Sequence, residues 1–165
     1  MSVHRLRSHL FALIIGINNY ESPSIQNLLG ASPNADAVRY YLQNDLGVPS
    51  SQITNLRNSE ATRDAIIDGI EAFSLNDDIN EGDPILIYYA GHVVLADTPK
   101  DWLDWNTDKI ELLVPYDDFS LDGDPRYGIS DRTLEVLLSQ LAIEKGHNIV
   151  RQAFILRNFI YQLTT

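Results

Sequence analysis

The chain has 165 residues and a mass of 18.6 kDa, which suits one domain with a sizeable core. Its 23 acidic and 12 basic residues give a net charge of −11, so no basic surface is available for phosphates and we expect no nucleic-acid partner. It contains no cysteine, which excludes a disulfide, a thiolate metal site and a thiol nucleophile within these residues.

The first ten residues predict a flexible N-terminus. Arg5 and Arg7 precede an apolar run, 11–15, that is too short for a secretory signal and lacks a small-residue cleavage site. No apolar run in the sequence has the length that crossing a bilayer requires. We therefore expect a cytoplasmic location and no membrane partner.

The next segments predict strand, helix, strand and helix. The apolar run 11–17 (FALIIGI) is typical of a strand buried on both faces. A helix is predicted over 33–46 and a short strand over 52–56, and Ser59 or Thr62 supplies the cap of a second helix. The positions predicted to face the core are Ala37, Val38, Tyr41, Leu42 and Leu46 in the first helix, and Ile66, Ile67, Ile70 and Phe73 in the second.

The strongest strand, 85–90 (ILIYYA), ends just before Gly91 and His92. A polar stretch follows, broken by a brief strand at 111–114, and a capped helix covers 130–145. This alternation predicts a single α/β domain with a mainly parallel sheet and helices on both faces. The last helix is predicted to turn Leu134, Leu137, Leu138 and Leu141 inward.

His92 occupies a position where functional groups gather, the carboxyl end of a strand in an open α/β sheet. Because imidazole titrates near neutrality, it could take a proton from a nucleophile and return it to a leaving amine. The alternative is a hydrogen-bonded loop histidine without a chemical role. Position alone does not separate the two.

Four segments occur in the order of the landmarks of the caspase and metacaspase clan, and they resemble fungal caspase-domain proteins most closely. They are FALIIGINNY (11–20), LLGASPNADAVRYYL (28–42), ILIYYAGH (85–92) and LLVPYD (112–117). The resemblance implies a three-layer caspase-hemoglobinase fold over 11–149 and peptide-bond hydrolysis by a Cys–His dyad, with His92 as the base. It also implies peptide or protein substrates with basic residues, no required cofactor, and calcium as an activating ion in some relatives.

Three departures from the family pattern set expectations for the site. The residue after the histidine, which with Gly91 is implied to stabilise the oxyanion, is Val93 instead of glycine. The position implied to bind a basic substrate side chain carries Asn34, with Asp36 half a helical turn away. No cysteine-bearing strand follows Ile149, so we expect an incomplete domain without peptidase activity.

The acidic stretch from Asp97 to Asp124 has two interpretations. Clustered carboxylates could bind calcium, with Asp117 and Asp118 as the candidate ligands. The spacing matches no EF-hand loop, however, and the alternative is a solvated loop pinned to the domain by Trp102 and Trp105.

The segment 150–165 differs from the rest because it contains Arg151 and Arg157 and no acidic residue. Three explanations stay open: a final strand centred on 154–156, a basic amphipathic helix for a membrane or partner, or a product of read-through into an intron. We favour read-through as the origin, and a strand or short helix as the conformation.

Two functions other than proteolysis are also compatible with the sequence. A pseudo-peptidase could pair with full-length relatives through an unpaired sheet edge. An unrelated doubly wound domain could bind a small ligand, although no glycine-rich phosphate loop supports it.

Overall fold

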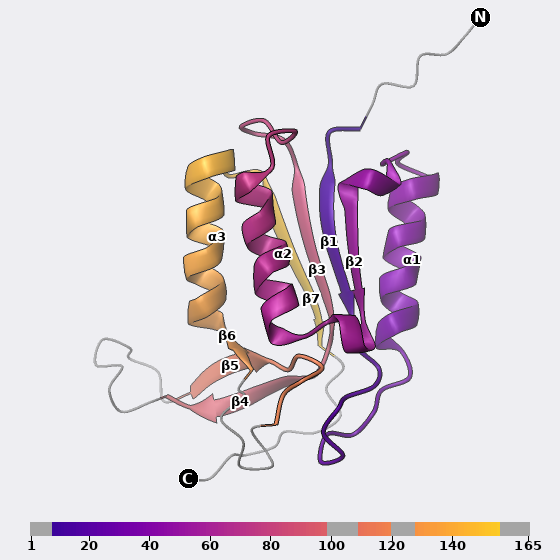
Figure 1. Ribbon diagram of the computed structural model, residues 1–165, viewed down its shortest axis with the longest axis vertical. Coiled ribbons are helices and arrows are strands. Elements are labelled where there is room, and N and C mark those ends of the chain that lie inside the picture. Colours follow the sequence, from indigo (N-terminus) through magenta and orange to yellow (C-terminus); the bar gives the residue numbers. More distant parts are fainter. Residues whose placement is uncertain (1–7, 99–108, 120–127, 156–165) are drawn as a thin grey trace, which may run out of the picture.

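The central sheet explains the strongest hydrophobic runs of the sequence. The computed structural model describes residues 8–98, 109–119 and 128–155. Four parallel strands lie in the order β2-β1-β3-β7 (Figure 1). They are β1 (Phe11–Gly16), β2 (Ile53–Arg57), β3 (Ile85–Gly91) and β7 (Ile149–Ile155).

Helices cover both faces of this sheet, as the sequence predicts. Along β1, Ala12 and Ile14 pack on the side of α1, whereas Leu13 and Ile15 pack on the side of α2 and α3. All four side chains are buried, because successive residues of a strand point to opposite faces. The three layers and the mainly parallel sheet are confirmed. The helices are α1 (Ala31–Asn44), α2 (Arg63–Leu75) and α3 (Asp131–Lys145).

Side-chain caps and glycines set the helix ends. Thr62, and not Ser59, is the N-cap of α2, where its hydroxyl accepts the N–H of Ala65. The hydroxyl of Ser130 accepts the N–H of Thr133 at the start of α3. Gly146, with φ of 85°, lets the chain leave α3 in a conformation that other residues rarely adopt.

The predicted core face of α1 is wrong in part. Leu42 is buried and Val38 is partly buried, as expected, but Ala37 is exposed and so are Tyr41 (54%) and Leu46 (46%). The helix begins at Ala31, two residues earlier than predicted, and packs on β1 through small residues. A Cβ on Gly16 would lie 2.6 Å from the Cβ of Ala35, closer than two carbon atoms can pack. The absence of a side chain at Gly16 therefore allows the helix to lie this close to the strand. The inward residues of α2 and α3 agree with prediction.

A second, antiparallel sheet lies at the end of the molecule toward which the parallel strands point (Figure 1). Its strands are β4 (Val93–Asp97), β5 (Lys109–Leu113) and β6 (Ile129–Ser130). The brief strand predicted at 111–114 is therefore β5, and β4 was missed. Within the acidic stretch 97–124, the solvated-loop interpretation is wrong for Asp97 and 109–110, which pair as parts of β4 and β5. Trp102, Trp105 and the acidic residues of 99–108 and 120–127 lie outside the described residues.

The segment after α3 forms a strand. β7 pairs with β3 in parallel, from Ile149 opposite Ile85 to Ile155 opposite Gly91. The strand interpretation is confirmed for this part, with a centre earlier than 154–156, and an amphipathic helix is wrong for it. Residues 156–165 lie outside the described residues, as do residues 1–7 of the predicted flexible N-terminus. Among the described helices, none has the length and hydrophobicity to span a membrane.

Candidate active site

β3 carries His92 to the carboxyl edge of the parallel sheet. The strand is buried along most of its length, which fixes the position of the residue that follows it. His92 itself is only 7% exposed. The histidine therefore follows a rigid, buried strand, at the carboxyl end that the sequence predicts.

A backbone carbonyl determines the proton arrangement of the imidazole. The Nε2 atom of His92 lies 2.7 Å from the carbonyl oxygen of Gln26. Because a carbonyl oxygen only accepts hydrogen bonds, the neutral ring donates through Nε2–H and keeps its lone pair on Nδ1. A histidine in this tautomer can act as a base through Nδ1.

Two buried tyrosines hold the backbone around His92. The Tyr20 hydroxyl oxygen accepts the N–H of His92 at 2.9 Å, and the two rings lie 5.1 Å apart between centroids. The Tyr89 hydroxyl lies 2.9 Å from the carbonyl oxygen of His92 and 2.8 Å from that of Val114. Burial raises the pKa of both tyrosines above the usual range. Both hydroxyls therefore stay protonated and neutral at physiological pH.

Gly91 is required by space. Gly91 is the last residue of β3 and its φ is not positive, so backbone conformation does not demand a glycine here. A Cβ at this position would lie 2.5 Å from the hydroxyl oxygen of Tyr89, which no real side chain tolerates. The glycine thus makes room for the tyrosine that binds the His92 carbonyl.

Val93 begins β4 directly after the histidine. It lies opposite Leu113, while the N–H of Val114 donates to the carbonyl oxygen of His92 at 3.0 Å. Hydrogen-bonded and non-bonded pairs alternate along an antiparallel ladder, so the N–H of Val93 points away from β5. Valine suits this extended backbone, because its branched side chain favours strand conformations.

The two residues predicted to bind substrate lie on α1. Asn34 is in the first turn, where its N–H donates to the carbonyl oxygen of Gly30. Asp36 is paired with Arg57, whose Nη2 lies 3.2 Å from Oδ1 of the carboxylate. Burial lowers the pKa of Arg57 and the carboxylate of Asp36 opposes that shift. The charge of Asp36 is thus already matched by an arginine of β2.

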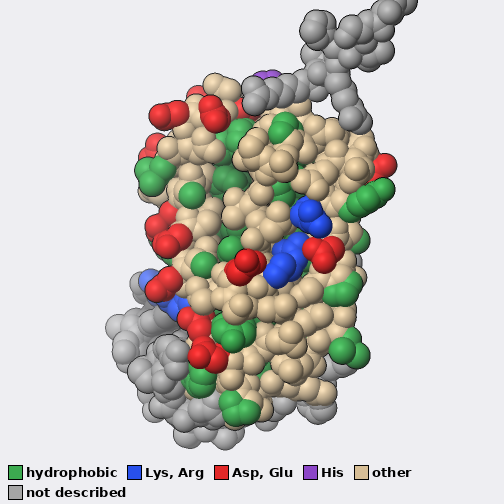
Figure 2. Space-filling view, turned by 45° about the vertical axis from the view of Figure 1, so that its right-hand side comes forward, with side chains coloured by type: hydrophobic (Ala, Val, Ile, Leu, Met, Phe, Trp, Pro, Cys, Tyr) green, Lys and Arg blue, Asp and Glu red, His purple; other side chains and the backbone are tan. Residues whose placement is uncertain are grey.

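The same arginine ties two strands together. Its Nη1 donates to the carbonyl oxygens of Ile14, at 2.8 Å, and Leu56, at 3.0 Å. On the face that Figure 2 shows, basic side chains lie beside acidic ones, and acidic side chains are spread more widely. Arg57 therefore links β1 and β2 as well as balancing the charge of Asp36.

The two predicted calcium ligands, Asp117 and Asp118, have different surroundings. Asp117 Oδ1 accepts the N–H of Arg63 at 2.8 Å, at the start of α2, where a carboxylate stabilises the helix. Asp118 is 2% exposed, and a Cβ on Gly128 would lie 3.3 Å from its Oδ2. In the part of the chain that the structure describes, no three acidic, histidine or cysteine side chains gather to hold a metal. Calcium binding by Asp117 and Asp118 stays a prediction.

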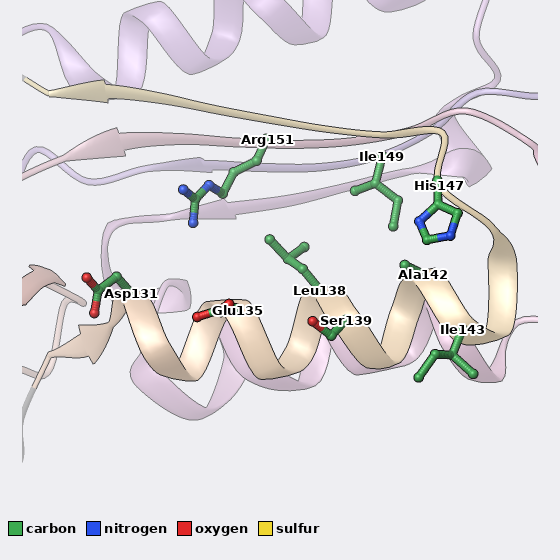
Figure 3. A pocket seen from close by; sticks show the side chains of 9 residues that line it. All are labelled: Asp131, Glu135, Leu138, Ser139, Ala142, Ile143, His147, Ile149 and Arg151. Carbon is green, nitrogen blue, oxygen red and sulfur yellow. The ribbon is translucent and has the colours of Figure 1, made fainter. Parts of the chain in front are cut away.

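A groove of about 770 Å³ lies between α3 and the edge strand β7, away from His92. In Figure 3 the side chains of Leu138, Ile149 and Arg151 point into the space between the helix and the strand. A smaller cavity of about 70 Å³ lies on the face of the sheet that α3 covers, and Val93 is among the residues that line it. His92 lines neither of these two cavities.

Several residues of the site were not found from the sequence. Tyr20 ends one of the quoted landmark segments, but its contact with His92 spans 72 residues. Gln26 acts through its backbone carbonyl, which any residue type possesses. The sequence pattern indicates only that Tyr89 is a core residue of β3. None of these three roles has a local signal in the sequence.

Comparisons with known proteins agree with this fold. A family model described as a caspase domain matches residues 9–143. No curated protein matches the sequence. The crystal structure of a Geobacter sulfurreducens protein, a structural genomics target, matches with a TM-score of 0.63 and 19% identity. The match covers 88% of this chain and 49% of that one, so the chain spans about half of that protein's length, and the likeness concerns the fold alone.

Proposed function

This chain belongs to the caspase domain family, and on that basis we propose that it carries the base of a Cys–His pair without the cysteine. Its closest family pattern is that of metacaspases and fungal caspase-domain proteins, whose activity is cysteine endopeptidase. The observation that carries the proposal is a buried His92 with Nε2 held by a carbonyl, in a chain with no cysteine. The described chain is then a catalytically silent caspase-like domain.

The chemistry shows what is missing. In a Cys–His pair, Nδ1 takes the thiol proton and the thiolate attacks the carbonyl carbon of the scissile peptide. The same proton then passes to the leaving amine as the C–N bond breaks. Without the sulfur no acyl-enzyme bond forms, and loss of a nucleophile typically removes on the order of a million-fold of rate.

The strand β7 supports this proposal by its position. The resemblance implies that the nucleophile is delivered by a strand that follows the last helix. β7 follows α3, pairs with β3 and ends with Ile155 opposite Gly91, one residue before His92. Its sequence, IVRQAFI, has no cysteine at any position.

The oxyanion and substrate assignments remain proposals. Val93 offers an N–H that points away from β5, and Gly91 precedes the histidine on the same edge. A basic substrate side chain would bind Asp36 only by displacing Arg57, since Asn34 has no charge to offer. Calcium activation would need ligands in addition to Asp117 and Asp118.

A fluorogenic peptide with arginine or lysine before the scissile bond tests the proposal, with and without calcium. We expect the chain, the His92→Ala variant and the His147→Ala control to give the same background rate. His147 is exposed and lies after α3, so it serves as a matched histidine. Turnover that is lost in His92→Ala but kept in His147→Ala would contradict the proposal.

A second function, an interaction module, is favoured by one observation. β7 is an edge strand of the four-stranded sheet, and its outer side borders the groove along α3. Exposed apolar residues lie on both elements, among them Val150 (56%) and Ile143 (77%). An edge with unpaired N–H and C=O groups next to an apolar groove suits a further strand, here from a full-length relative.

Size-exclusion chromatography with a full-length caspase-domain relative tests this module. Val150→Lys should abolish the complex, because a lysine on an edge strand opposes further pairing. Val136→Lys is the matched control, since Val136 is similarly exposed (64%) but lies on α3 and not on the edge strand. A chain that stays monomeric with the relative contradicts this function.

A further inference from the structure

One loop makes two of the contacts that fix His92, one to its backbone N–H and one to its ring. The segment 18–28 follows β1 and carries Tyr20, whose hydroxyl binds the backbone N–H of His92 at 2.9 Å. The same loop carries Gln26, whose carbonyl oxygen binds Nε2 at 2.7 Å. The orientation of the imidazole thus depends on the shape of this loop.

The base of the loop is anchored independently. Asn58, in a left-handed conformation with φ of 47°, directs its Oδ1 to the N–H groups of Asn18 (2.9 Å) and Asn19 (3.1 Å). The carbonyl oxygen of Asn18 in turn accepts the N–H of Leu28 at 2.7 Å. These bonds close the loop where it leaves and rejoins the domain.

One side chain links the two ends of the loop that contact His92. Oδ1 of Asn27 accepts the backbone N–H of Tyr20 at 3.1 Å, although the two residues are 7 positions apart. Asn27 directly follows Gln26, so this bond links the neighbour of the residue that holds the imidazole nitrogen to Tyr20, which holds the His92 backbone. Asn27 is itself exposed and contributes little to the core.

We propose that Asn27 is a positioning residue that keeps the Gln26 carbonyl on Nε2 of His92 and thereby holds the ring in the Nε2–H tautomer. The role of that tautomer as a base rests on the proposed function, but the positioning does not. Loss of the Asn27 side chain would remove the link between Tyr20 and the residue next to Gln26, while the bonds of Asn58 and Asn18 would keep the loop base in place.

NMR of the ¹⁵N-histidine-labelled chain tests the proposal without any activity. In the wild type we expect a hydrogen-bonded Hε2 signal for His92 and an unprotonated Nδ1. In Asn27→Ala, exchange of Hε2 with water should become about tenfold faster, the factor expected when one hydrogen bond of ordinary net strength is lost. Asn27→Asp retains an acceptor oxygen and should restore the wild-type signal.

Asn44→Ala is the control, because the Asn44 side chain binds the carbonyl of Tyr40 at the far end of α1. A folded Asn27→Ala variant with an unchanged Hε2 signal would overturn the proposal. If that variant does not fold, hydrogen exchange of the wild type decides: an unprotected Tyr20 amide would equally overturn it. Peptide turnover plays no part in these measurements, so they stand or fall separately from the proposed function.

Discussion

The Nε2 atom of His92 lies 2.7 Å from the carbonyl oxygen of Gln26, although the two residues are 66 positions apart in the chain. The contact joins the carboxyl end of β3 to the loop after β1. Because Nε2 donates its hydrogen to this carbonyl, the lone pair of the neutral ring is on Nδ1, which is left for proton transfer.

This contact and the burial of His92 predict protection from chemical modification. Diethylpyrocarbonate should label His9, whose side chain is 68% exposed, well before His92 in the native protein. Labelling can be followed by mass spectrometry of the peptides. In urea the two histidines should react alike, and native labelling of His92 at the rate of His9 would contradict the burial.

Replacing Tyr89 by phenylalanine should destabilise the fold by about 1–3 kcal/mol, because the buried carbonyl of Val114 loses its donor. Urea unfolding followed by circular dichroism measures this change. Tyr40→Phe is the control: Tyr40 is 64% exposed, and its replacement should change stability by less than about 0.5 kcal/mol. Equal effects of both changes would mean that the Tyr89 hydroxyl makes no net contribution.

The raised pKa values of Tyr20 and Tyr89 predict loss of stability at high pH. Burial keeps both hydroxyls protonated in the folded state, while tyrosines of the unfolded chain lose their protons near pH 10. The unfolded state then binds fewer protons, so the free energy of unfolding is unaffected by these groups below about pH 10 and falls above it. Urea unfolding from about pH 8 to 11 measures the slope, and Tyr89→Phe should reduce it. A slope unchanged by this substitution would refute the assignment.

Gly91→Ala should destabilise the protein and disturb the backbone at His92, because the added Cβ meets the Tyr89 hydroxyl at 2.5 Å. Removing that hydroxyl relieves part of the overlap, so the cost of Gly91→Ala should be smaller in a Tyr89→Phe background. A double-mutant cycle by urea unfolding gives the coupling. Strictly additive effects would argue against the contact.

Leu141→Ala should cost about 2–5 kcal/mol, since Leu141 is fully buried within the core beneath α3. Ile143→Ala, two residues along the same helix, removes a side chain that is 77% exposed and should change stability far less. Thermal unfolding of the two variants makes the comparison. A similar loss in both would mean that α3 packs through a different face.

The parallel sheet and its two helical faces were accessible from the sequence because their signals are local. The run FALIIGI has no polar residue and predicts a strand buried on both faces, which β1 is. Thr62 and Ser130 are hydroxyl residues just before periodic apolar segments, and both cap their helices. The missed strand β4 lacked such a signal, because its edge position leaves its residues only half buried.

The sequence by itself determined that a histidine follows β3 and that no cysteine is present to partner it. Only the tertiary structure decided what His92 touches, because the groups involved, a carbonyl of Gln26 and the hydroxyls of Tyr20 and Tyr89, meet through chain reversals that carry no local pattern. It also decided that Asp36 is paired with Arg57, since an ion pair across 21 residues depends on how α1 packs on the sheet. The sequence states which residue types are present, whereas the packing of distant segments decides which of them form hydrogen bonds with each other.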